Sequence, residues 1–407
     1  MSPTDPARGV LPLVVTIAVQ ALVSLAALAA PVMAPAAALS TGLPAGWVGI
    51  FVGVVYAAAC VSTLVAGDLV SRFGPIRMSQ VSLVLCGSGL FAAALATPAG
   101  LVLSAVLIGL GYGPVTPASS HILIRTTPPH RMSLTFSLKQ TGVPLGGMLA
   151  GLMVPLLIHG LGWQGAAICL GGALLAMAAV TQTIRPMFDS DRDPSRPLAP
   201  SRALKPLMKV LATPALRDLG LCSFFFGAMQ LCLTSFLVLY LTEARGLSLV
   251  TAGSILAVAQ VAGVVGRLGW GWMADKVIVP RLLLGLLGVV MGAAGISLAM
   301  VGPGVPILGF ALIAAIFGAS AIGWNGVFLA EVARLAAPGE VGAATGASLF
   351  LTYGGVVVGP PLFASLVAQS HSYPLGFLAF GALLSAVGVF LMLTGPRRGG
   401  RQASAPS

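Results

Sequence analysis

Charged residues are scarce in this sequence, and acidic residues are the scarcest of them. Of the 407 residues, 8% are charged, and 10 aspartates and glutamates stand against 21 lysines and arginines. A soluble domain carries about 25% charged residues, because its surface must face water. The sequence therefore excludes a soluble globular protein.

Long apolar segments take the place of a charged surface. Hydrophobic residues make up 57% of the chain, and apolar runs of about 18 residues or more are typical of helices that span a membrane. We therefore predict an all-α membrane protein with twelve transmembrane helices in a lipid bilayer. The predicted segments are 11–38, 46–66, 78–97, 100–123, 133–158, 161–184, 216–241, 249–272, 282–301, 305–329, 341–368 and 373–394.

Several kinds of site are missing from the sequence. The five cysteines lie inside the apolar segments without paired loop spacing, which argues against a disulfide framework or a metal site. The sequence has no phosphate-binding loop with its lysine and no context for a catalytic triad. We expect neither an enzyme nor a cofactor. The basic residues lie mostly in short loops, which does not indicate nucleic-acid binding.

The lysines and arginines predict the orientation in the membrane, because cytoplasmic loops carry an excess of both. With the N-terminus inside, nearly all of them fall in cytoplasmic loops. Arg245 alone falls outside, and Lys139 and Arg267 lie within apolar segments. We therefore expect cytoplasmic termini and a multi-pass, monomeric protein of the inner (plasma) membrane.

The chain divides into two similar halves. Residues 185–214 are polar and rich in proline, serine and charge, which predicts a cytoplasmic linker. It separates an N-terminal six-helix half, 1–184, from a C-terminal six-helix half, 215–396, and 397–407 form a cytoplasmic tail. Gly67 to Arg77 follows the second segment much as Gly271 to Arg281 follows the eighth. Two halves related by a parallel repeat are the plan of one large transporter class.

The two related stretches resemble the signature G-x-x-x-D-[RK]-x-G-[RK]-[RK] of the major facilitator superfamily. The second copy matches at Gly271, Asp275 and Lys276, whereas Ile278 replaces the later glycine. The resemblance implies that the aspartate latches the two halves in the outward-open state. The first copy keeps the glycines and an arginine but has Ser71 in place of the aspartate, with Asp68 nearby as a substitute. The gating residues expected from this copy are Gly67, Asp68, Arg72, Gly74 and Arg77.

Polar residues inside apolar segments predict a substrate site near the midplane, between the halves. No aspartate or glutamate lies well inside any segment, so two buried cations have no carboxylate partner. An anionic substrate would supply that partner, since the planar fork of arginine binds a carboxylate through two parallel hydrogen bonds. The predicted substrate-binding residues are Gln20, Tyr56, Tyr112, Lys139, Gln140, Gln230, Gln260, Arg267, Asn325 and Tyr353.

A structural role for the two cations is the competing interpretation. Arg267 lies four residues before Gly271, about 6 Å along a helix, and Lys139 about 9 Å inside its segment. Both side chains are long enough to reach the membrane surface without touching a substrate. Arg267 could also pair with loop carbonyls instead of a substrate. The pattern R-x-x-x-G-x-x-A-D from Arg267 to Asp275 also resembles the eighth span of monocarboxylate and oxalate–formate transporters. That resemblance implies that the arginine contacts the substrate carboxylate.

The sequence thus predicts a secondary transporter that moves a small organic solute by alternating access, with a small carboxylate anion as the favoured cargo. Its expected partners are that small molecule, the bilayer, and protons or a counter-anion. One alternative is an exporter of hydrophobic or cationic compounds of the drug/proton antiporter type, since Pro144 and Gly146-Gly147 resemble part of the antiporter motif. The other alternative is a membrane sensor that does not transport.

Overall fold

The computed structural model describes residues 6–42, 47–195, 204–302 and 304–394, and the described residues contain helices but no strand. A lipid-embedded backbone must satisfy its own hydrogen bonds, which a helix achieves within one segment. The first half contains α1 (Pro6–Thr41), α2 (Trp47–Phe73), α3 (Pro75–Ala94), α4 (Pro98–Thr126), α5 (Met132–Gln140) and α6 (Gly142–Val180). The second half contains α9 (Pro214–Leu239), α10 (Leu249–Lys276), α11 (Pro280–Met300), α12 (Ile307–Ala321), α13 (Asn325–Leu335), α14 (Val341–Ser370) and α15 (Tyr373–Leu393).

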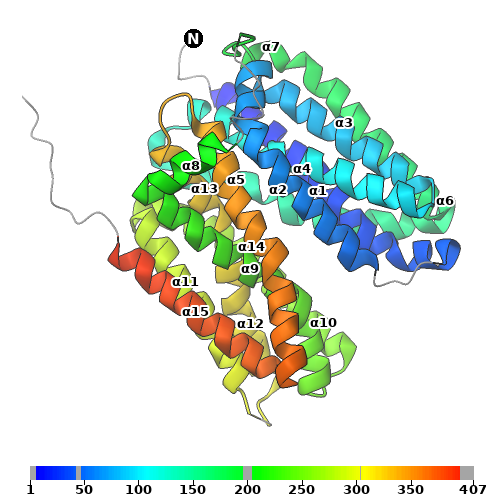
Figure 1. Ribbon diagram of the computed structural model, residues 1–407, viewed down its shortest axis with the longest axis vertical. Coiled ribbons are helices and arrows are strands. Elements are labelled where there is room, and N and C mark those ends of the chain that lie inside the picture. The colour runs from blue at the N-terminus through cyan, green and yellow to red at the C-terminus, as the bar shows by residue number, and fades with distance from the viewer. Residues whose placement is uncertain (1–5, 43–46, 196–203, 303, 395–407) are drawn as a thin grey trace, which may run out of the picture.

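These helices form two bundles. In Figure 1 the N-terminal bundle, α1 to α6, runs to the right, and the C-terminal bundle, α9 to α15, runs downward. The bundles meet through α2, α4 and α5 on one side and α10, α13 and α14 on the other. Two short helices of the linker, α7 (Arg185–Phe188) and α8 (Lys205–Ala212), lie at the end where the bundles meet. We call this end the linker side.

Eleven apolar helical stretches among the described residues are long enough to cross a membrane. The longest, Pro129–Thr183, has 55 residues. It would extend about 80 Å as a straight helix, against a hydrocarbon core of about 30 Å. Gly162 interrupts it with φ 70° and ψ 171°. This stretch covers the predicted segment 133–158 and all but the last residue of the predicted segment 161–184, and it is long enough for two crossings.

Two helices continue past the predicted ends of their apolar segments. The second segment was expected to end at residue 66, but α2 continues to Phe73, and α10 continues past residue 272 to Lys276. Within α2, no glycine has a positive φ, and the first such glycine after it is Gly74, whose φ is +95°. Within α10, the glycines also keep a helical φ, and the next proline is Pro280. Most of each signature therefore lies in the last helical turns. The predicted ends of the second and eighth segments, residues 66 and 272, are therefore too early.

Small residues let the helices of each bundle approach closely. A Cβ atom added to Gly288 of α11 would lie 2.9 Å from the Cα atom of Gly388 in α15. Contacts of this kind hold membrane helices together through van der Waals packing, since lipid provides little hydrophobic drive.

The linker divides between the two bundles. The stretch from α7 to Ser195 lies against the N-terminal bundle, and α8 packs on α9 and α14. Residues 196–203 of the predicted linker and the predicted tail, 397–407, are outside the described residues.

Candidate functional site

Lys139 lies at the end of α5, with only 1% of its surface exposed. Its ammonium group donates to three neutral oxygens: Gln20 Oε1 at 2.7 Å, Thr116 Oγ1 at 3.1 Å and Gln140 Oε1 at 3.1 Å. An ammonium group has three donors, so each of them has a partner. All of these partners belong to the N-terminal bundle, and none carries a negative charge.

Arg267 approaches the same place from the C-terminal bundle and is 2% exposed. Its Nε donates to the carbonyl oxygen of Ile322 at 2.9 Å, and its Nη1 donates to the carbonyl oxygen of Gln140. The Ile322 carbonyl lies in the interruption between α12 and α13, where helix ends leave carbonyls without helical partners. Gln140 therefore joins the two cations: its side chain accepts from Lys139 and its main chain from Arg267.

The two cations form an uncompensated positive centre. They lie close enough to repel each other, and none of the ion pairs between described residues includes either one. Both side chains are buried and donate to oxygens inside the protein, and the two carbonyl partners of Arg267 also fit the structural interpretation in which it pairs with loop carbonyls. A buried charge without an opposite charge is costly, and an anion bound here would reduce that cost.

Three tyrosines meet beside the cations. Tyr56 of α2, Tyr112 of α4 and Tyr353 of α14 have ring centroids 5.8 to 6.1 Å apart. Tyr112 lies near Arg267 and near Ser24 of α1. Three of the predicted substrate-binding residues are thus brought together from both bundles.

The remaining predicted residues divide into two groups. Gln230 of α9 accepts hydrogen bonds from Asn325 Nδ2 and Trp324 Nε1, each at 3.2 Å, next to the interruption that holds Arg267. Gln260 is exposed on α10 and, in the described part of the chain, has no hydrogen bond to the cation centre.

Sequence reasoning missed Thr116, Ser24 and Trp324. Ser24 follows Gln20 by one helical turn and accepts from its Nε2 at 3.2 Å, so a helical-spacing search around each polar residue would have found it. Trp324 directly precedes Asn325, a predicted site residue, and its position beside a polar residue in an apolar segment could have identified it. Thr116 contacts Lys139 only because α4 packs beside α5, and no local pattern indicates this.

Asp275 joins the two bundles on the linker side. Its carboxylate, 3% exposed, accepts from the backbone amides of Ser133 at 3.0 Å and Leu134 at 2.8 Å, in the first turn of α5. Arg334 Nη2 of α13 donates to it at 2.9 Å. A carboxylate at a helix N-terminus satisfies free amides and interacts favourably with the helix dipole. The geometry is that of a latch between the bundles.

Two signature glycines allow the bundles to come close. A Cβ atom added to Gly271 would lie 2.8 Å from Ser137 Cβ of α5, and one added to Gly67 would lie 2.6 Å from Ala343 Cβ of α14. Lys276 is exposed at the end of α10, and the Arg72 guanidinium lies 5.6 Å from the Phe73 ring centroid.

The first signature copy is engaged by the linker rather than by the other bundle. Asp189 accepts from the backbone amides of Ile76 at 2.8 Å and Arg77 at 3.1 Å, at the start of α3. An added Cβ on Gly74 would lie 2.6 Å from Asp189 Oδ1, so glycine is required for this approach. Burial raises the pKa of Asp189 above its ordinary value, and the two amide hydrogen bonds only partly offset that effect.

Asp191 ties the linker to α4. Its Oδ2 lies 2.7 Å from His121 Nε2 and 2.7 Å from Arg125 Nη1. Burial acts to raise the pKa of Asp191, but the hydrogen bond from His121 and the charges of His121 and Arg125 outweigh it and hold the pKa below its ordinary value.

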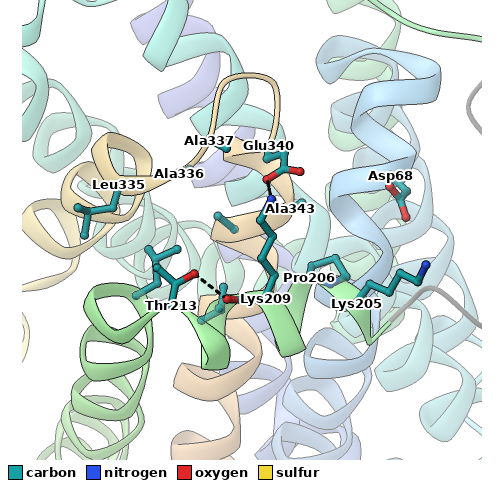
Figure 2. Close-up of a pocket in the computed structure, with 13 residues that line it drawn as sticks. Asp68, Lys205, Pro206, Lys209, Thr213, Leu335, Ala336, Ala337, Glu340 and Ala343 are labelled. Atoms are coloured by element: carbon teal, nitrogen blue, oxygen red, sulfur yellow. Dashed lines mark hydrogen bonds and ion pairs between the residues drawn. The ribbon is translucent and has the colours of Figure 1, made fainter.

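Asp68, the suggested substitute for the missing aspartate, lines a pocket of about 640 Å³ between the end of α2, α8 and the start of α14. Figure 2 shows Lys209 of α8 paired with Glu340, while Lys205 extends on the side of the pocket where Asp68 lies. Two carboxylates, Asp68 and Glu340, and the two lysines of α8 line this pocket, which gives it mixed charge (Figure 2).

Comparison with known proteins identifies relatives over nearly the whole chain. A family model described as Major Facilitator Superfamily matches residues 15–360. The gallate transporter of Pseudomonas putida is 25% identical over 403 residues, covering 89% of this chain and 84% of the relative. Human monocarboxylate transporter 11 is 28% identical over 351 residues, covering 82% and 71%. Among solved structures, FucP in the outward conformation has a TM-score of 0.73 at 15% identity, covering 96% of this chain and 100% of that one.

Proposed function

This chain belongs to the major facilitator superfamily of membrane transporters, and from that premise we propose that it moves a small organic carboxylate across the membrane by alternating access. Lys139 and Arg267 recognise the carboxylate, and Gln20, Gln140 and Thr116 position the lysine. The observation that carries this proposal is the buried pair of cations, whose hydrogen-bond partners are all neutral oxygens.

The charge balance of the site supports an anionic substrate. Each cation comes from a different bundle, so an anion between them attracts both bundles toward one point. The guanidinium of Arg267 has five N–H donors in a planar fork, which suits two parallel hydrogen bonds to one carboxylate. In this structure Lys139 donates to Gln20 Oε1 and Arg267 donates to the Gln140 carbonyl oxygen. The bound carboxylate accepts these hydrogen bonds in their place.

Two relatives support a carboxylate rather than another anion. Gallate and monocarboxylates are organic acids, and the transporters that bear their names align with most of this chain. In the described spans the carboxylates lie near the helix ends, as Asp275 and Asp218 do. Exchange of anions, or uptake of a proton together with the anion, therefore fits better than an acidic relay in the midplane.

The gating contacts support a rocking mechanism. The bundles touch on the linker side through Asp275, Gly271 and Gly67, and they diverge away from it (Figure 1). Substrate then enters from the opposite side, and the linker side opens when α5 leaves Asp275. The distribution of lysine and arginine makes the linker side cytoplasmic. We propose twelve crossings in the inner membrane, cytoplasmic termini and a monomer.

The proposal is tested with purified protein in liposomes. Counterflow of labelled acetate, lactate and benzoate is measured with and without a pH gradient, and a labelled lipophilic cation is measured in parallel. We expect a carboxylate to exchange. Exchange of the cation alone would refute the proposal in favour of an exporter, and movement of neither compound would favour a sensor.

The role of Arg267 is tested by Arg267→Lys, with Arg245→Lys as the matched control. Arg245 lies outside the central site and contacts Tyr240. Because lysine cannot form two parallel bonds to a carboxylate, exchange should fall at least about 10-fold in Arg267→Lys, the effect of about 1.4 kcal/mol. It should be unchanged in Arg245→Lys. Equal exchange by the two variants would show that Arg267 does not bind the cargo.

A further inference from the structure

The three tyrosines form an aromatic layer that the charge argument does not explain. Tyr112 and Tyr353 are buried, and Tyr56 is partly buried. The Tyr56 and Tyr112 rings meet edge to face at 72°, and both are tilted by 55° to 57° against Tyr353. Edge-to-face and tilted rings at this separation attract each other. Two of the three ring pairs cross from one bundle to the other.

This layer lies one helical turn from the cation centre. Tyr112 precedes Thr116 by four residues on α4, and Ser24 follows Gln20 by four residues on α1. Four residues correspond to about 6 Å along a helix. Thr116 and Gln20 hold Lys139, whereas Tyr112 and Ser24 lie on the side away from the linker. A ligand whose carboxylate binds the cations therefore extends into the tyrosines only if it carries a group beyond its first carbons.

The tyrosine hydroxyls offer polar groups around this layer. Among the described residues, Tyr56 and Tyr353 do not use their hydroxyls in a hydrogen bond within the protein. A hydroxyl in a membrane interior is costly unless it has a partner. Phenylalanine would pack equally well, so the hydroxyls are best explained by a partner that arrives with the cargo.

We propose that the cargo is an aromatic carboxylate, whose ring is held by Tyr56, Tyr112 and Tyr353 while its carboxylate binds Lys139 and Arg267. This inference rests on the proposed transport of carboxylates and adds the class of the group that carries the carboxylate. The aromatic ring replaces ring contacts between the bundles, and ring hydroxyl substituents reach the free tyrosine hydroxyls. An aliphatic acid such as acetate binds the cations but does not reach the aromatic layer.

The inference is tested by competition in the liposome counterflow assay. Unlabelled benzoate, cyclohexanecarboxylate, glucuronate and acetate are compared as competitors of labelled benzoate. Cyclohexanecarboxylate has a similar size and apolarity but no aromatic ring. One aromatic pair contributes a factor of roughly 2 to 12, so benzoate should compete about 10-fold better than cyclohexanecarboxylate. Equal competition by these two acids, or better competition by glucuronate or acetate, would overturn the inference.

The same comparison in variants assigns the preference to the tyrosines. In Tyr353→Leu, benzoate and cyclohexanecarboxylate should compete equally well. Tyr353→Phe should keep the preference for benzoate and lose affinity for 4-hydroxybenzoate. Tyr373→Leu, outside the central site, is the control. A preference that persists in Tyr353→Leu would place the ring elsewhere. The wild-type comparison stands even if Tyr353→Leu fails to fold.

Failure of this inference is distinguishable from failure of the proposed function. If aliphatic and aromatic acids exchange equally in the wild-type protein, the carboxylate site stands and the aromatic class is wrong. If no carboxylate of either kind exchanges, the proposed function itself is wrong.

Discussion

Replacing Asp275 by asparagine should open the linker side. The carboxylate accepts two backbone amides of α5 and one donor from Arg334. Asparagine keeps a single carbonyl oxygen and no charge, so at least one charge-assisted hydrogen bond and the interaction with the helix dipole are lost. A hydrogen bond to a charged group contributes about 1.5–3 kcal/mol. Loss of about 2 kcal/mol shifts the equilibrium roughly 30-fold toward states in which the linker side is open.

The shift can be measured by double electron–electron resonance, which gives the distribution of distances between two spin labels. The labels are attached at Arg131→Cys and Lys276→Cys, which are exposed on opposite bundles at the linker side, in a variant whose five native cysteines are replaced by alanine. We expect Asp275→Asn to populate a longer distance. Glu331→Gln is the control, because Glu331 pairs with the same Arg334 at 3.5 Å but within α13. An unchanged distance distribution, or an equal shift in the control, would refute the latch.

Three further predictions concern the site and the linker. Lys139→Met should abolish anion exchange yet leave the thermal unfolding temperature in detergent equal or higher, since replacing a buried charge by an apolar group is often neutral or stabilising; a large decrease would contradict this. Gly74→Ala should lower that temperature by the equivalent of about 1–3 kcal/mol, because Gly74 has a positive φ and touches Asp189; Gly53→Ala, with open space around it, should not lower it. The pKa of Asp191 is held below its ordinary value, so its contacts stabilise the linker above about pH 4 and are lost as pH falls through the lowered pKa. The loss of hydrogen-exchange protection that Asp191→Asn causes in 185–195 should therefore be present at pH 5 and shrink as the pH falls below about 4, whereas an equal loss at pH 3 would contradict the assignment.

Much of the fold followed from local features of the sequence. The all-α membrane class is confirmed, and so is the family, which the second signature copy indicated through Gly271, Asp275 and Lys276. The helix ends at the signatures were less accurate. Hydropathy reports where an apolar run ends, whereas α2 and α10 continue beyond that point until a backbone conformation such as that of Gly74 ends the helix.

The candidate site was predicted in part. The two cations stood out because a charge in an apolar segment is costly, and the three tyrosines were recognised as polar groups in spans. Their partners were harder to find. Asp189 lies in a polar linker among several charged residues, and nothing in that composition indicates that it binds the start of α3.

By itself the sequence determined that this protein lies in a membrane and that its buried charges are positive, because hydropathy and charge can be read residue by residue. Only the tertiary structure decided which residues meet. Arg267 and Gln140 are 127 positions apart, and their contact depends on how α10 and α5 are rotated and how closely small residues let the bundles approach. The same packing brings three tyrosines from three helices into one layer, one turn from the cations, and our proposal of an aromatic carboxylate rests on that layer.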